Sequence, residues 1–203
     1  MRLGIVLSVL LASAGCVYDA VRMETRTLPE RNPTVYQFEF PLEELRARVM
    51  AGLTRDEQYK NPIFGTQKSG SEYAWTLSVF DAKRSWSWMK ALQLPGNDRD
   101  LYLGDDADPL WDSPIYRGPH DGLPFHAHFH VHFAAISPTA TSVSVTALET
   151  YVINGQTTGM PGHGRARREV RVEPTSVEEY VVLRYIGGIL GVRSMPKVIL
   201  PAP

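Results

Sequence analysis

The chain has 203 residues, of which 43% are hydrophobic and 21% are charged, with 21 Lys and Arg against 22 Asp and Glu. This ordinary globular composition excludes a disordered chain and a basic protein that binds nucleic acid mainly through phosphate charge. The single Cys excludes an internal disulfide framework and a Cys-rich zinc site.

The first sixteen residues, MRLGIVLSVLLASAGC, have the order of a secretory signal peptide. Arg2 gives a positive start, and an uncharged apolar stretch runs from Leu3 to Ala12. A helix of this length spans about 15 Å, whereas a bilayer core is about 30 Å thick, so the stretch is too short for a transmembrane helix. Small residues then precede Cys16. This order predicts a signal peptide over residues 1–15.

Residues 13–16, Ser-Ala-Gly-Cys, resemble the lipobox of bacterial lipoproteins. The resemblance implies cleavage before Cys16, which would then carry a thioether-linked diacylglycerol and an amide-linked acyl chain such as palmitate. Val17 follows Cys16, and in this family that implies the outer membrane, with the domain facing the periplasm. The alternatives are a plain secretory signal and a cytosolic protein with an apolar start.

The remaining chain predicts a lipidated tether over 16–33, one domain over 34–195 and a C-terminal tail over 196–203. Within the domain, residues 82–124 are expected to form an irregular insertion. It contains Trp86 and Trp88, which suit core packing or an aromatic contact patch. Its Asp-rich loop offers oxygen ligands for Ca²⁺, but the spacing does not match an EF-hand.

Alternation of apolar and polar residues predicts strands over 34–40, 73–79 and 166–173 and a hairpin of 125–136 with 141–153. Helical spacing predicts one helix from Pro41 to near Arg55. It predicts a second helix from Thr175, with Glu178 in a capping box, to near Leu190. In this helix Gly187 and Gly188 are expected to make the last turns irregular.

This order predicts an α+β fold, in which two helices pack on one face of an antiparallel sheet. It is similar to the small helix-grip domains of envelope lipoproteins, a similarity carried by the order of elements alone.

The most informative local pattern is HAHFHVH, which holds four of the six histidines of the chain. Alternate residues of a strand point to one face, so these imidazoles are expected to line one side of the sheet. The residues between them are apolar and are expected to face the core opposite Val143, Val145 and Ala147. The four histidines are His126, His128, His130 and His132.

Three interpretations of these histidines remain open. They can form an ordinary half-exposed polar surface, or a cluster that charges in acid. They can also bind Zn, Cu or Ni ions through imidazole nitrogens, with His120, Asp121 or His163 completing the ligand shell.

The sequence contains no GxSxG, Walker A, GxGxxG or HExxH motif, and the lipid would occupy Cys16. We therefore expect a non-catalytic binding or scaffolding lipoprotein that requires no cofactor. Its partner would be an envelope protein or the cell wall, in addition to the membrane that holds its lipid, and not nucleic acid. The alternatives are a metal-binding lipoprotein and, with less support, a metal-dependent hydrolase.

Overall fold

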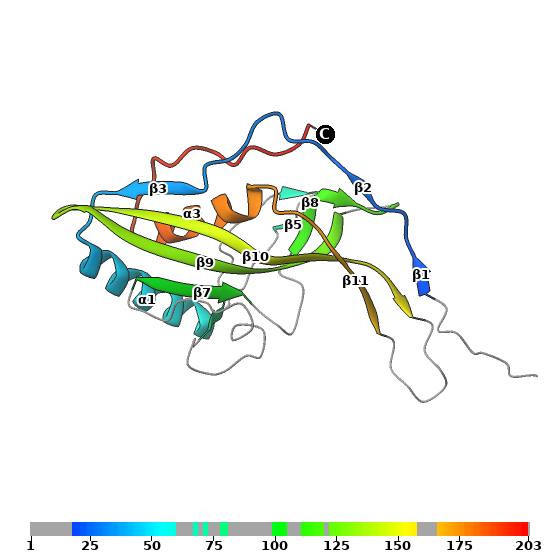
Figure 1. Cartoon of the computed structure of the whole chain (residues 1–203), viewed down its shortest axis with the longest axis horizontal. Coiled ribbons are helices and arrows are strands. Elements are labelled where there is room, and N and C mark those ends of the chain that lie inside the picture. Colours follow the sequence, from blue (N-terminus) through cyan, green and yellow to red (C-terminus); the bar gives the residue numbers. More distant parts are fainter. Residues whose placement is uncertain are drawn as a thin grey trace, which may run out of the picture.

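The computed structural model describes residues 18–59, 67–68, 71–72, 78–80, 99–104, 111–119, 122–157 and 166–202. These residues form an α+β fold, with a curled antiparallel sheet and, among the described residues, two helices (Figure 1). In chain order the elements are β1 (Tyr18–Ala20), β2 (Glu24–Thr25), β3 (Val35–Phe38), α1 (Leu42–Tyr59), β4 (Gln67–Lys68), β5 (Ser71–Glu72), β6 (Ser78–Phe80), β7 (Asp100–Gly104), β8 (Trp111–Arg117), β9 (Gly122–Ser137), β10 (Ala140–Thr157), β11 (Arg167–Arg171) and α3 (Val177–Ile189).

The long hairpin of β9 and β10 forms the centre of the 9-stranded sheet. Its register confirms the expected core face, because Val143 pairs with Phe133, Val145 with Val131 and Ala147 with Phe129. All of these side chains are buried. The predicted hairpin is therefore confirmed, and its strands extend beyond the expected ends to 16 and 18 residues.

Two further strands of the main sheet lie where an irregular insertion was expected. β7 pairs with β9 and buries Leu101 and Leu103 on its core side. β8 also pairs with β9, at Trp111 with Phe125, although it contains Pro114. Most of the described residues of the expected insertion 82–124 thus belong to the sheet. Trp86 and Trp88 and most of the Asp-rich loop lie outside the described residues.

The expected tether over 16–33 also differs from the structure, from residue 18 onward. β1 pairs with the end of β10, with Tyr18 opposite Thr157 and Ala20 opposite Gly155. β2 pairs with β8, and Asn32 is buried. The chain is therefore attached to the sheet only two residues after Cys16.

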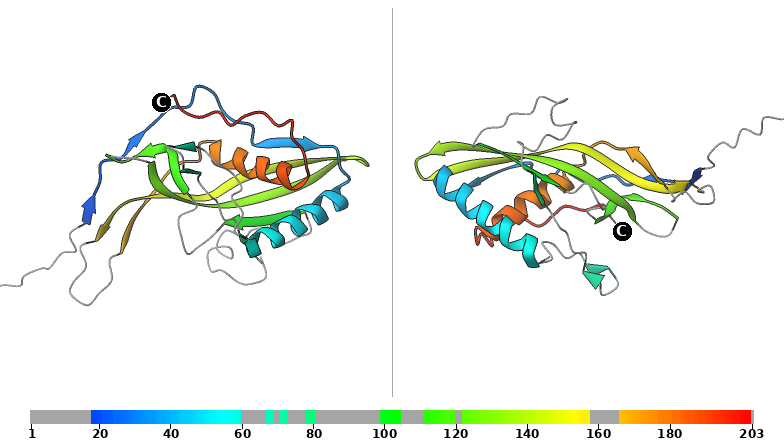
Figure 2. Two further views of the ribbon diagram at one scale, coloured as in Figure 1. Left: turned by 180° about the vertical axis from the view of Figure 1, so that it is seen from behind. Right: turned by 90° about the horizontal axis from the view of Figure 1, so that it is seen from below.

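The C-terminal residues are attached to the same segment. The Asn32 side chain donates from Nδ2 to the Ile199 carbonyl oxygen at 3.0 Å and accepts from the Ile199 N–H at 2.7 Å. The Tyr180 hydroxyl donates to the carbonyl oxygen of Pro196. Residues 196–202 of the expected tail thus run beside the segment that leads into β3 (Figure 2, left).

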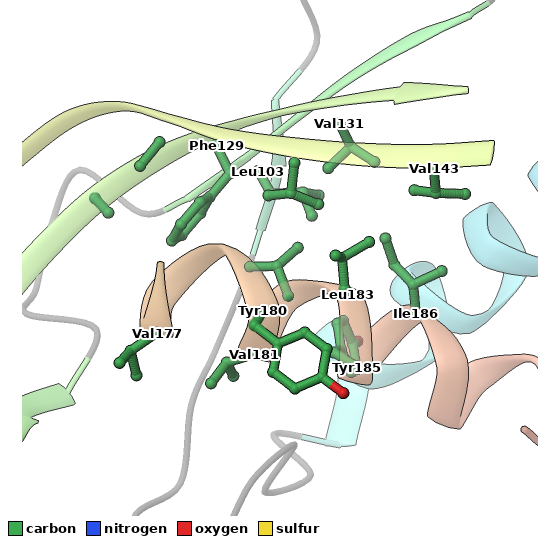
Figure 3. Packing of buried hydrophobic residues seen from close by; sticks show 14 of the residues in the cluster. Leu103, Phe129, Val131, Val143, Val177, Tyr180, Val181, Leu183, Tyr185 and Ile186 are labelled. Carbon is green, nitrogen blue, oxygen red and sulfur yellow. The ribbon is translucent and has the colours of Figure 1, made fainter. Parts of the chain in front are cut away.

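The two helices form as their apolar spacing predicts. α1 begins after Pro41, whose carbonyl accepts from the Leu45 N–H, and it buries Leu45 and Val49. The predicted stripe of α3 is buried at Val182, Leu183, Ile186 and Leu190. Leu183 and Ile186 point toward strand residues such as Val131 and Val143 (Figure 3). These residues of both helices and the core side of β9 belong to one hydrophobic cluster.

Two glycines allow this close packing. A Cβ on Gly52 of α1 would lie 2.4 Å from Cγ2 of Ile189 in α3, so the helices meet where a side chain is absent. A Cβ on Gly187 would lie 2.2 Å from Sδ of Met195. The end of α3 is regular to Ile189, although Gly187 and Gly188 were expected to disturb it. Packing against the residues that follow the helix offsets the low helix propensity of glycine.

Candidate functional site

The four predicted histidines lie on β9, on the side of the sheet opposite its apolar core. Their burial differs along the strand: His126 and His128 are 3% and 5% exposed, whereas His130 and His132 are half-buried. The interpretation as a half-exposed polar surface thus fits only the second pair. We call His126, His128, His130 and His132, together with Glu149 and Tyr151 of β10, the histidine face.

A β-bulge in β10 determines which residues lie opposite the two buried histidines. The register shifts between Ala147 and Glu149, so that Glu149 lies opposite His128 and Thr150 opposite Ala127. If the pairing of Ala147 with Phe129 continued without this shift, Leu148 would lie opposite His128. The bulge therefore turns a carboxylate toward the histidines and keeps Leu148 out of that position, as bulges near functional sites often re-aim side chains.

His128 and Glu149 form an ionisable pair on the histidine face. The His128 Nδ1 atom lies 3.6 Å from Oε2 of Glu149, and the two side chains are 6% and 26% exposed. The other carboxylate oxygen, Oε1, accepts a hydrogen bond from the Arg171 guanidinium at 3.5 Å. Glu149 therefore connects a buried imidazole to an exposed arginine on the neighbouring strand β11.

The other buried histidine, His126, makes an aromatic contact with β10. The His126 ring stacks on Tyr151, with centroids 4.7 Å apart and planes 8° from parallel. Tyr151 in turn pairs in register with Arg171. The sequence signal for this arrangement is a change of phase in β10: the buried residues shift from odd positions such as Val145 to even positions such as Val152. This shift marks the bulge, and straight alternation overlooks it.

The outer part of the histidine face is more open. The rings of His130 and His132 lie 6.2 Å apart between centroids and are tilted by 55°. In register, Thr146 and Ser144 of β10 lie opposite them, and Tyr102 and Asp100 of β7 lie on the other side. This part offers imidazoles and hydroxyl groups to a polar ligand.

A buried glutamate supports the bulge from the core side. Glu179 of α3 is 5% exposed. Its carboxylate accepts a hydrogen bond from the backbone N–H of Ala147, where the register shift begins. Burial raises the pKa of the Glu179 carboxyl, whereas this hydrogen bond, another with Ser176 and the charge of Arg31 act in the opposite direction. The first turn of α3 thus contacts β10 beside the bulge that places Glu149 on the histidine face.

The beginning of α3 forms part of the predicted capping box. The Glu178 carboxylate accepts from the Thr175 N–H at 3.0 Å and from the Thr175 hydroxyl at 2.6 Å. The N-cap residue, however, is Ser176, in the left-handed conformation and without a side-chain cap. Burial raises the pKa of Glu178, although the hydrogen bonds from Thr175 lower it.

Burial, together with the nearby charges of Glu178 and Glu173, raises the pKa of Tyr116 to about 12.

The metal interpretation can be compared with this geometry. Among the described residues, no three or more His, Cys, Asp or Glu side chains lie close enough together to hold an ion. His128 and Glu149 would offer one nitrogen and one oxygen to an ion. The other suggested ligands, His120, Asp121 and His163, lie outside the described residues, as does Cys16. Physiological binding of Zn, Cu or Ni therefore stays a prediction.

Comparisons with known proteins do not assign this site. No family model matches the chain, and neither a curated protein nor a solved structure shows significant similarity to it. In the part of the chain that the structure describes, no helix has the length and apolarity needed to cross a bilayer.

Proposed function

We propose that this protein is a lipid-anchored binding module of the bacterial cell envelope. Cys16 would be acylated and inserted into the outer membrane, and the domain would face the periplasm. The observation that carries the proposal is the sequence Ser-Ala-Gly-Cys at 13–16 after a short apolar segment. The attachment of the chain to the sheet from Tyr18 onward is compatible with it, because the folded domain begins directly after the anchor.

In this proposal the domain binds an envelope protein or the cell wall without catalysis. Both helices would cover the core face of the sheet and leave the histidine face for the partner. The support is chemical: His130 and His132 are half-buried, and farther along the same face the Glu149–Arg171 pair adds opposite charges beside His128. The histidine face can donate hydrogen bonds to a partner and accept them at fixed positions, which gives specificity more than affinity.

The anchor is tested by growing cells with radiolabelled palmitate and isolating the protein. The native chain should be labelled and found with the membranes, and Cys16→Ser should be unlabelled and released by washing. Since Cys16 is the only cysteine, no other thiol can take up the lipid. An unlabelled native chain, or a Cys16→Ser variant that stays equally membrane-bound, would contradict the proposal.

The binding face is tested with a photo-crosslinking amino acid introduced in living cells. One variant carries it at His130 on the histidine face, and a matched variant carries it at Glu43, which is exposed on α1. We expect a discrete adduct from position 130 and none from position 43. Equal adducts from both positions, or none from position 130, would contradict a partner at the histidine face.

Metal binding is a second candidate because His128 Nδ1 and Glu149 Oε2 lie 3.6 Å apart. A zinc site uses three or four protein ligands, so this pair needs further ligands from outside the described residues. Elemental analysis of untagged protein purified without a nickel column tests it. A metal-free protein whose melting temperature does not change with Zn²⁺ or Cu²⁺ would exclude this candidate. It would also exclude the metal-dependent hydrolase, which needs the same ion.

A further inference from the structure

One end of the sheet is defined by where the chain enters it. β1 pairs with the last residues of β10, so Tyr18, Asp19 and Ala20 lie beside Thr157, Gln156 and Gly155. β11 begins at the same end, where Arg167 pairs with Gln156. Both views show β1 and the ends of β10 and β11 together at one extremity of the molecule (Figure 2).

The distance from this end to Cys16 is limited by the chain. Only Val17 lies between Cys16 and Tyr18, so the two Cα atoms are at most about 7 Å apart, at up to about 3.6 Å per residue. A flexible segment over 16–33 would instead have a typical span of roughly 25 Å, at about 5–6 Å times the square root of its length. The pairing of β1 therefore removes most of the freedom that a tether would give the domain.

The opposite end of the hairpin is far away. Between Ala140 and Gly155, β10 extends for roughly 50 Å at about 3.3 Å per residue. A lipid on Cys16 therefore lies close to the β1 end and remote from the turn that joins β9 and β10. The β1 end carries both Asp19 and Arg167, so charge does not by itself favour this end for an anionic surface, and the short connection to Cys16 is what favours it.

We propose that the end of the sheet formed by β1, residues 155–157 of β10 and the beginning of β11 lies against the headgroups of the membrane that holds Cys16. The turn between β9 and β10 is then the distal end of the domain. This inference rests on the proposed function, because it requires a lipid at Cys16. It also gives the histidine face an orientation, with His126 nearer the membrane than His132.

The test reconstitutes the chain from Cys16 onward, which contains every described residue. The single thiol at Cys16 is coupled to a maleimide lipid in vesicles of phosphatidylethanolamine and phosphatidylglycerol. A fluorescent amino acid replaces either Ala166, just before β11, or Thr139, in the turn between β9 and β10; both residues are exposed. Energy transfer to a rhodamine-labelled lipid reports how close each position is to the bilayer.

We expect the donor at position 166 to lose most of its emission and the donor at position 139 to keep most of it. Equal transfer from the two positions, or stronger transfer from position 139, would overturn the inference. Because the coupling is chemical, this result does not depend on acylation in cells. A failure of palmitate labelling would reject the proposed function and leave the vesicle result unchanged.

Two variants test whether the pairing of β1 produces the orientation. A Cβ on Gly155 would lie 2.0 Å from the Asp19 carbonyl oxygen, so Gly155→Ala should separate β1 from β10. A flexible Gly-Ser insertion between Val17 and Tyr18 lengthens the connection and changes no described residue. In each variant, the difference in energy transfer between donors at positions 166 and 139 should become smaller. If the insertion leaves that difference unchanged, the short connection does not orient the domain and the inference is wrong.

Discussion

The Glu149 carboxylate lies opposite His128 across the β9–β10 ladder, with Oε2 3.6 Å from the imidazole Nδ1. This relationship depends on the bulge at Ala147 and Glu149, since unshifted pairing would place Leu148 there. A single extra residue in β10 thus changes the chemistry of the face that β9 presents.

A double-mutant cycle measures this contact. We expect His128→Gln and Glu149→Gln to couple by about 0.5–3 kcal/mol in the free energy of unfolding, because both groups are largely removed from water. The control pair is Arg48 and Glu44 on α1, which lie 2.6 Å apart but are 53% and 45% exposed. Solvent screening should limit the control coupling to about 0.3–0.5 kcal/mol. A coupling for the buried pair no larger than that of the exposed pair would contradict this interpretation.

The buried carboxyl of Glu178 should make the stability of the protein pH-dependent. Burial raises its pKa above the ordinary value of 4.5, so the folded state keeps its proton at a pH where the unfolded chain has lost it. The contribution of this group is fully present below pH 4.5 and is lost as the pH rises through the folded pKa.

Glu178→Gln should remove this loss, because the amide oxygen can still accept the hydrogen bonds from Thr175. The free energy of unfolding of the variant relative to the native protein should therefore increase as the pH is raised from 4.5. Denaturation with urea at several pH values measures the difference, with Glu43→Gln on the exposed side of α1 as the control. A difference that stays constant or decreases with pH would contradict the raised pKa.

Much of the central fold could be predicted from the sequence because β9, and β10 as far as Ala147, alternate between buried and more exposed residues. Val143, Val145, Phe129 and Val131 mark a core face that any straight hairpin would use, and the structure pairs them as expected. The apolar stripe of α3 was equally clear, since Leu183 and Ile186 recur at helical spacing. In both cases, local periodicity and tertiary burial coincide.

Other elements could not be predicted because tertiary contacts determine them. β7 is short and lies among aspartates and glycines, so only Leu101 and Leu103 indicate its buried side. β1 has no apolar alternation and becomes a strand because the end of β10 offers it a partner. The histidine positions were predicted from β9 alone, whereas Glu149 and Tyr151 depend on a bulge in its partner strand.

The contact between the two helices gives a matched pair of glycine substitutions. A Cβ on Gly52 would meet Ile189 at 2.4 Å, whereas one on Gly188 would have no atom within 4 Å. We expect Gly52→Ala to destabilise the protein by about 1–3 kcal/mol through overpacking. Gly188→Ala should stabilise it by about 0.5–1 kcal/mol, since alanine favours a helix. Thermal unfolding measures both, and equal effects of the two variants would contradict the close packing of α1 on α3.

The attachment of the C-terminal residues depends on Asn32. Asn32→Ala removes both hydrogen bonds to Ile199 and should cost about 1–3 kcal/mol, because the backbone groups of Ile199 lose their partner. Trypsin should then cleave faster after Lys197, which is exposed. Asn32→Asp keeps the acceptor oxygen and should have an intermediate effect. An unchanged rate of cleavage in Asn32→Ala would show that other contacts hold these residues.

The central claim is that the chain begins at an acylated Cys16 in a bacterial membrane. Intact mass spectrometry of the protein extracted from membranes with detergent tests it most directly. The account predicts a mass equal to the chain from Cys16 onward plus a diacylglyceryl group and one further acyl chain. A mass that includes Met1, or a chain that begins at Cys16 or elsewhere without lipid, would contradict it.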